Sequence, residues 1–157
     1  MSVSRVLKLA SLPIFALLAA PSAAQNTALD PNYETVTLTA GFEPDPRVIS
    51  LRAGGNIDAS NADSDCTGFI TDAPDVRLHY ESGSYPLILS VAANSDTTLV
   101  VNGPDGSWHC NDDGGEGSNP SIRLEAPESG RYEIWVGTYR SGNSQPARLH
   151  ISEVSSQ

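Results

Sequence analysis

The sequence predicts an all-β fold, an antiparallel β-sandwich or jelly-roll-like single domain that follows a cleaved signal peptide. Short segments between residues 33 and 154 alternate apolar and polar side chains, which is the period of half-buried strands. Glycine, proline, asparagine and aspartate interrupt these segments at short intervals, as turns do in sandwiches. No segment after residue 24 shows the helical period, so parallel strands joined by crossover helices are not expected.

Residues 1–24 have the pattern of a secretory signal peptide. A positively charged start precedes the apolar run of residues 9–20, and Ser22-Ala23-Ala24 supplies small residues for cleavage before Gln25. The run is shorter than a membrane-spanning helix needs, which argues against the alternative of a membrane anchor. We therefore expect an exported chain, periplasmic or secreted, without membrane insertion after cleavage. We divide the mature part into 25–53, a lead with the first strands, and 54–157, the main sandwich.

We expect roughly ten short strands after the signal peptide. Their apolar residues recur at every second position, so one face of each strand turns toward a core. The expected strands are residues 33–38, 47–52, 56–60, 66–71, 76–81, 87–93, 97–101, 107–110, 121–125, 131–139 and 147–154. The side chains expected on the core face include Val36, Leu38, Ile49, Leu51, Val76, Leu78, Tyr80, Ile122, Leu124, Tyr132, Ile134, Val136, Leu149 and Ile151.

The chain that remains after removal of residues 1–24 is strongly acidic and contains no lysine. Nine basic residues minus Arg5 and Lys8 leave seven arginines against 19 acids, a formal charge of −12. Nucleic-acid binding needs a basic surface, so that class of function is not expected. The charge also argues against anionic membrane surfaces and favours cations as ligands.

Cys66 and Cys110 are the only two cysteines, and we expect them to form a disulfide. An even number of cysteines in an exported chain is typical of a structural bond. A redox pair or a zinc pair is the alternative, but the sequence contains no C-x-x-C motif.

The acidic, glycine-rich residues 111–119 are the strongest candidate for a metal site. Carboxylate and amide oxygens are the ligands that Ca²⁺ takes, and glycines let backbone carbonyls turn inward. A bond between Cys66 and Cys110 would also bring the acids before Cys66 close to this loop. The alternative is a solvated acidic turn that binds no metal. The predicted calcium ligands are Asp96, Asp112, Asp113, Glu116, Asp63 and Asp65.

Three motifs resemble the bacterial pre-peptidase C-terminal domain. They are VRLHYESGSYPLILSV at 76–91, DTTLVVNGPDG at 96–106 and APESGRYEIWVG at 126–137, and the resemblance covers about residues 54–151. It implies a small β-sandwich of the kind that accompanies secreted hydrolases, with calcium binding as in related collagen-binding modules. It also matches Asp96 to the acid that heads one of the family's strands. The cysteine pair is not part of the family's pattern, and the chain has no room for a catalytic domain.

Aromatic residues form a second candidate surface. The alternation in 131–139 places Trp135 and Tyr139 opposite the core face, beside Glu133, and Trp108 lies in the preceding hairpin. Exposed aromatics of this kind form platforms for sugars or peptides. The alternative is that they lie beneath a loop.

The three histidines, His79, His109 and His150, show no zinc-binding spacing. We expect His79 and His150 to be surface residues, because they lie opposite the apolar face of their strands.

The sequence therefore favours a non-catalytic, exported β-sandwich that binds an extracellular polymer, peptide or partner protein. A structural accessory protein whose calcium site only stiffens loops is a second hypothesis. No G-x-S-x-G motif is present, so a secreted hydrolase or peptidase-associated protein is the alternative rather than the expectation.

Overall fold

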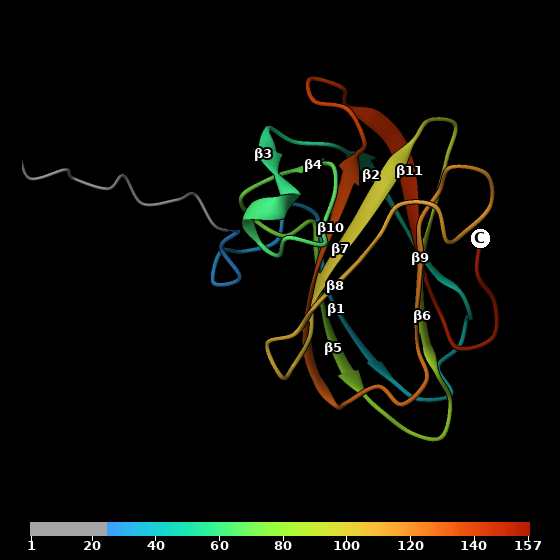
Figure 1. The fold of residues 1–157 in the computed structure, drawn as a ribbon. Coiled ribbons are helices and arrows are strands. Elements are labelled where there is room, and N and C mark those ends of the chain that lie inside the picture. The colour runs from blue at the N-terminus through green and yellow to red at the C-terminus, as the bar shows by residue number, and fades with distance from the viewer. Residues whose placement is uncertain (1–24) are drawn as a thin grey trace, which may run out of the picture.

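The computed structural model describes residues 25–157 as two β-sheets packed face to face (Figure 1). The predicted signal peptide, residues 1–24, lies outside the described residues. The only helical element of residues 25–157 is the short 3-10 helix η1, Ala59–Asn61, so the predicted all-β sandwich is confirmed. The strands are β1 Glu34–Thr39, β2 Arg47–Ala53, β3 Ile57–Asp58, β4 Phe69–Ile70, β5 Val76–Glu81, β6 Leu87–Ala93, β7 Thr97–Asn102, β8 Trp108–Asn111, β9 Ser121–Leu124, β10 Gly130–Thr138 and β11 Gln145–Ser152.

The first sheet, called sheet A, is organised around the long strand β10. One edge of β10 pairs with β5, and its other edge pairs with β7, which in turn pairs with β8. The short strand β4 pairs with the end of β10, where Thr138 lies opposite Phe69. β3 pairs in turn with β4. β1 pairs with β5 at the outer edge of the sheet.

The pairing of β1 with β5 is parallel, and every other strand pair of the described residues is antiparallel. The antiparallel prediction is therefore wrong at this one pair. Parallel neighbours need a long connection. Here no crossover helix makes the connection from β1 to β5. The chain passes instead through β2 in the second sheet and then through β3, η1 and β4.

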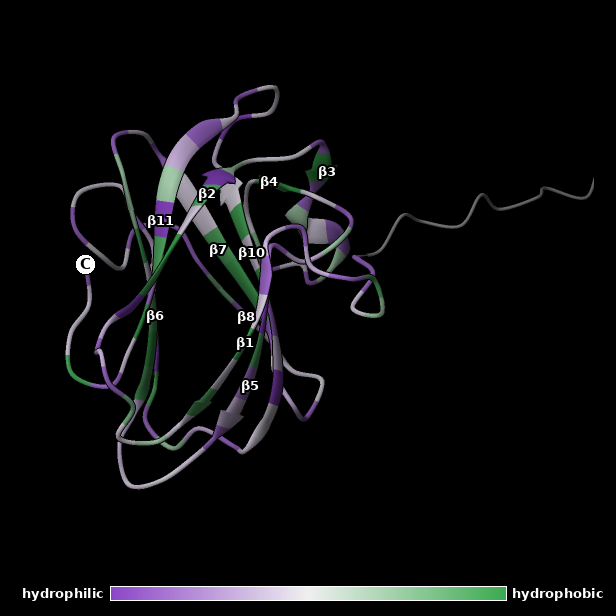
Figure 2. Ribbon diagram, turned by 180° about the vertical axis from the view of Figure 1, so that it is seen from behind, coloured by the Kyte–Doolittle hydropathy of each residue, from purple (hydrophilic) through white to green (hydrophobic). Residues whose placement is uncertain are grey.

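The second sheet, called sheet B, has the strand order β2-β11-β6-β9. Its inward side chains meet those of sheet A in one hydrophobic core. Figure 2 shows green, hydrophobic stretches along strands of both sheets. Val36 of β1 and Ile49 and Leu51 of β2 belong to this core, so residues 25–53 share it with residues 54–157. The faces predicted for Tyr132, Ile134 and Val136 are confirmed.

A small outer layer covers the other face of sheet A. The chain between β2 and β5 extends sheet A as β3 and β4, and with η1 it projects from the outer face of that sheet in both views (Figures 1 and 2). Gly137 permits this close approach, because a Cβ there would lie 2.8 Å from Cγ2 of Ile70. Ile70 and Ala59 pack with Val100 and Trp135 in a second hydrophobic cluster.

The Cys66–Cys110 disulfide holds this outer layer against β8. The structure contains the bond, with 5.2 Å between the two Cα atoms, and it has no free cysteine among residues 25–157. The expected strands 56–60 and 66–71 shorten to the two-residue strands β3 and β4. The physical reason is that this segment gains its stability from packing on sheet A and from the disulfide rather than from a long ladder.

The side chain of Asp75 bonds to β10 between the residues that pair with β5 and the residue that pairs with β4. Its carboxylate accepts a 2.8 Å hydrogen bond from the backbone N–H of Val136 and a 3.1 Å bond from the side chain of Asn32. Asp75 is 2 % exposed. Burial raises the pKa of Asp75 to about 6, although both hydrogen bonds act in the opposite direction.

No helix in the described part of the chain is long and apolar enough to cross a membrane.

The raised pKa of Asp75 predicts a loss of stability as the pH rises from about 4 to above 6. The folded state holds the proton more tightly than the unfolded state, so its advantage is complete below the unfolded pKa, 3.8, and is lost through about 6. The difference corresponds to about 3 kcal/mol. Urea unfolding of wild type and Asp75→Asn at several pH values measures it. Wild type should lose stability relative to the variant across this window, and parallel pH profiles would contradict the prediction.

Candidate functional site

Three loops meet at one end of the sandwich and form the candidate site. They are residues 94–96 between β6 and β7, 112–120 between β8 and β9, and 139–144 between β10 and β11. The backbone N–H of Tyr139 donates to the carbonyl of Asp96, which joins the first and third loops. The N–H of Thr97 donates to the carbonyl of Ser118, which joins the first and second.

Asp96 is electrostatically coupled to the acidic loop. Desolvation raises its pKa, and the charges of Asp113 and Asp112 raise it further, while Arg140 acts in the opposite direction. The fold thus brings carboxylates from two separate loops into one region of negative potential. Glu116, in the same loop, lines a groove together with Asp96.

The amide oxygens of the acidic loop are used to build the loop itself. Oδ1 of Asn111 accepts hydrogen bonds from the backbone N–H groups of Gly114 and Ser121, at 2.7 and 2.9 Å. Oδ1 of Asn119 accepts from the hydroxyl of Thr97 at 2.9 Å, and its Nδ2 donates to the carbonyls of Ala93 and Glu116. These two amides therefore fix the loop's shape and are already occupied as acceptors.

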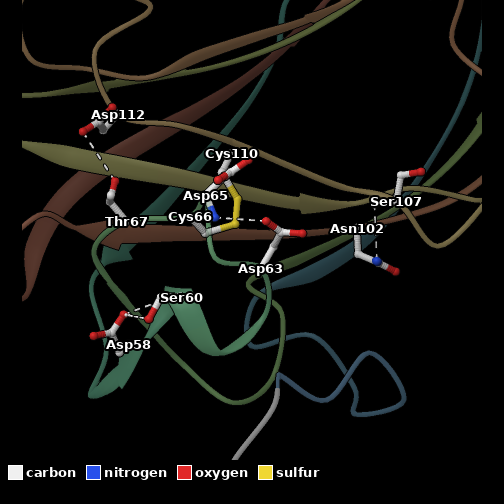
Figure 3. Close-up of a disulfide and its surroundings, with 10 residues drawn as sticks. All are labelled: Asp58, Ser60, Asp63, Asp65, Cys66, Thr67, Asn102, Ser107, Cys110 and Asp112. Carbon is white, nitrogen blue, oxygen red and sulfur yellow. Dashed lines mark hydrogen bonds between the residues drawn. A yellow bond between two sulfur atoms is a disulfide. The ribbon is translucent and has the colours of Figure 1, made fainter.

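The disulfide does not gather the remaining acids into one cluster. In Figure 3, Asp65 lies beside Cys110, whereas Asp63 and Asp112 lie to opposite sides of the bond. Asp63 accepts a 3.0 Å hydrogen bond from the backbone N–H of Asp65, and Asp112 is 3.4 Å from the hydroxyl of Thr67. Within residues 25–157, no group of three or more His, Cys, Asp or Glu side chains is arranged to hold a metal ion. Calcium binding by the six predicted residues stays a prediction.

A groove that the sequence does not reveal opens beside the acidic loop, on the outer face of sheet B. Its volume is about 820 Å³. Ser50, Arg148 and Ala92 form its floor in one row across β2, β11 and β6, because Arg148 lies opposite both of the others. The loop residues 116–119 and Gln157 line its wall. Such a row depends on the register of three strands, which the sequence does not specify.

The groove wall contains one polar side-chain atom without a partner in the described part of the protein. The hydroxyl of Ser95 is buried and makes no hydrogen bond. A buried, unpaired hydroxyl costs free energy. Asp96, Glu116 and Arg148 add charges of both signs to the rim.

The prediction of an aromatic platform is wrong for Trp135. Its side chain is fully buried, because the outer layer packs over it and Trp108 lies on it with 5.6 Å between the ring centroids. The alternative, burial beneath a loop, is the correct one for this residue. Trp108 is half-buried in the same cluster, and only Tyr139, which is 47 % exposed, faces solvent freely.

Of the two histidines expected at the surface, only His79 is exposed. His150 is 8 % exposed, and burial lowers the pKa of its ring, as does the charge of Arg148. The reason is that residues 153–157 return across the outer face of sheet B. There the N–H of Gln157 donates to Ser90, the neighbour of His150 in β6, and Ser156 donates to Ser121.

No protein-family model matches the chain, and no curated protein sequence matches it significantly. Among solved structures it is similar to Aeromonas hydrophila PliG, a periplasmic lysozyme inhibitor of g-type lysozyme. The two share 17 % sequence identity over 76 % of this chain and 96 % of that chain, with a TM-score of 0.38. That score is too low to establish a common fold, so we transfer none of that protein's properties to this chain.

The coupling among the acids predicts that neutralising Asp112 and Asp113 will shift the titration of Asp96. In Asp112→Asn/Asp113→Asn the pKa of Asp96 should fall toward its ordinary value, because two like charges that favour its protonation are gone. Carboxyl chemical shifts of Asp96 followed by NMR across acidic pH measure this. An unchanged titration midpoint would show that the loops do not meet as described.

Proposed function

We propose that the chain is an exported, non-catalytic binding module, whose ligand is an extracellular polymer, a peptide or a partner protein. The observation that carries this proposal is the groove of about 820 Å³ on sheet B, with the mixed charges of Asp96, Glu116 and Arg148 along it. Concave sites with a few converging polar groups are the usual places for ligands. The groove lies on a regular sheet, so its floor is rigid in the absence of ligand.

The side-chain arrangement supports a role without chemistry. Cys66 and Cys110 are joined to each other, so neither is available as a thiolate nucleophile. Among residues 25–157, no hydrogen bond joins a histidine ring to a serine or carboxylate side chain, the contact that activates a serine nucleophile. Both ring nitrogens of the buried His150 lack a partner altogether.

Calcium binding at the loop end is the second part of the proposal. Asp96, Asp112 and Asp113 repel one another, and a divalent cation would turn that repulsion into attraction. Since Asn111 and Asn119 are committed to the loop, carboxylates, backbone carbonyls and water would supply the oxygens. The resemblance to pre-peptidase C-terminal domains, which include calcium-binding relatives, is a further reason for proposing calcium here. On this view calcium stiffens the wall of the groove, and the groove holds the ligand.

Binding can be tested with peptidoglycan sacculi, chitin and gelatin as insoluble extracellular polymers. Wild type should sediment with at least one of them. Ala92→Trp fills the groove from the outer face of β6 and should weaken that binding by about tenfold or more, a change of about 1.4 kcal/mol. Thr35→Trp, on the exposed face of β1, is the matched control and should bind as wild type does. Retention by Ala92→Trp would exclude the groove, and no retention of wild type would contradict polymer binding.

Calcium binding should raise the melting temperature of the wild-type protein by a few degrees. Extracellular sites have dissociation constants on the order of 10⁻⁴–10⁻³ M, so calcium at ten times that value adds roughly 1.4 kcal/mol. Magnesium should do less, because it demands a tighter octahedral shell.

The matched control is Asp112→Asn/Asp113→Asn, which should lose the calcium response and should melt at or above wild type in chelator because repulsion is relieved. Melting curves of wild type that coincide in chelator and in millimolar calcium would show that the loop is only a solvated acidic turn.

A further inference from the structure

Gln25 combines two features that its place in the sequence does not explain. It is 6 % exposed, although it is polar and lies near the start of the described chain. Its side-chain Nε2 and Oε1 are both buried and have no hydrogen-bond partner. A glutamine amide offers two donors and one acceptor, so leaving all of them unpaired in a buried position is costly.

The segment that follows Gln25 is held firmly on the outer face of sheet A. The backbone N–H of Asn26 donates to the carbonyl of Asp72 at 3.1 Å, next to the outer layer. Nη2 of Arg77 donates to the carbonyls of Thr27 and Leu29, at 3.1 and 2.8 Å. Arg77 is itself fixed by its 2.6 Å ion pair with the buried Glu133. Gln25 is therefore carried into its buried position by a docked segment.

Cleavage of the signal peptide would place a charge at this position. The predicted cleavage follows Ala24, so Gln25 would become the first residue, with a free α-amino group. An α-amino group has a pKa of about 7.7–8.0 and is largely protonated at neutral pH. Burying an ammonium ion beside an unpaired amide costs far more than burying either neutral group.

We propose that Gln25 is a modification site, converted to pyroglutamate after export. The α-amino nitrogen attacks Cδ of the same residue's side chain and forms a five-membered lactam. The Cδ–Nε2 bond breaks, and the nitrogen leaves as ammonia with the proton given up by the amine, so no oxidant or other co-reactant is needed. The product has no terminal charge, and a single lactam N–H replaces the donors of the ammonium and of the side-chain amide, which suits the closed environment of residue 25. This inference rests on the export that is part of the proposed function.

The test is the mass and terminal sequence of the full-length precursor after expression and export. The expected product begins at residue 25, is about 17 Da lighter than the unmodified chain through loss of one ammonia, and is blocked to Edman sequencing. Gln25→Asn is the matched control, because its side chain is one methylene too short for the five-membered ring. It should keep a free amine and melt at a lower temperature than wild type.

A wild-type chain that begins at Gln25 with a free amine would overturn the modification while leaving export intact. A chain that begins at another residue of the mature protein would overturn the modification for the same reason. A chain that keeps Met1 would contradict export and the modification together. Equal melting temperatures for cyclised wild type and Gln25→Asn would show that residue 25 does not require an uncharged terminus.

Discussion

The burial of Trp135 under the outer layer is the constraint on which the rest of the structure depends. Trp135 lies on the solvent-side face of β10, the central strand of sheet A, where a sandwich normally places polar residues. Truncation of a buried tryptophan to alanine costs roughly 3–5 kcal/mol, so the burial of Trp135 is a large contribution to the stability of the fold. That segment has only two-residue strands of its own, and the Cys66–Cys110 bond keeps it in place.

The same bond links the outer layer to the loop end of the molecule. Cys110 lies one residue before the end of β8, so the acidic loop begins where the disulfide fixes the chain. Thr67, next to Cys66, lies against Asp112, and Asn111 ties the loop back to the start of β9. The loop is thus anchored at both ends before any ligand arrives. This explains how Asp96, Asp112 and Asp113 are kept close together despite their mutual repulsion.

Much of the fold could be predicted from the sequence, because alternation reports which face of a strand is buried. The expected strands 76–81 and 87–93 coincide with β5 and β6, and the inward faces of β2, β10 and β11 are correct. Alternation does not report what covers the other face, so Trp135 and His150 were expected at the surface and are buried. The groove could not be predicted from the sequence either, because its floor of Ser50, Arg148 and Ala92 depends on the register of three strands distant in sequence.

The most direct measurement of the central role of the outer layer is the accessibility of tryptophan in Cys66→Ser/Cys110→Ser. Trp108 and Trp135 are the only tryptophans, so quenching of fluorescence by acrylamide reports on this cluster alone. We expect the variant to keep its β-sheet circular dichroism, to expose its tryptophans to the quencher, and to lose roughly 2–4 kcal/mol of unfolding free energy. Quenching and unfolding free energy equal to those of wild type would show that the outer layer holds Trp135 without the disulfide, and would contradict this account.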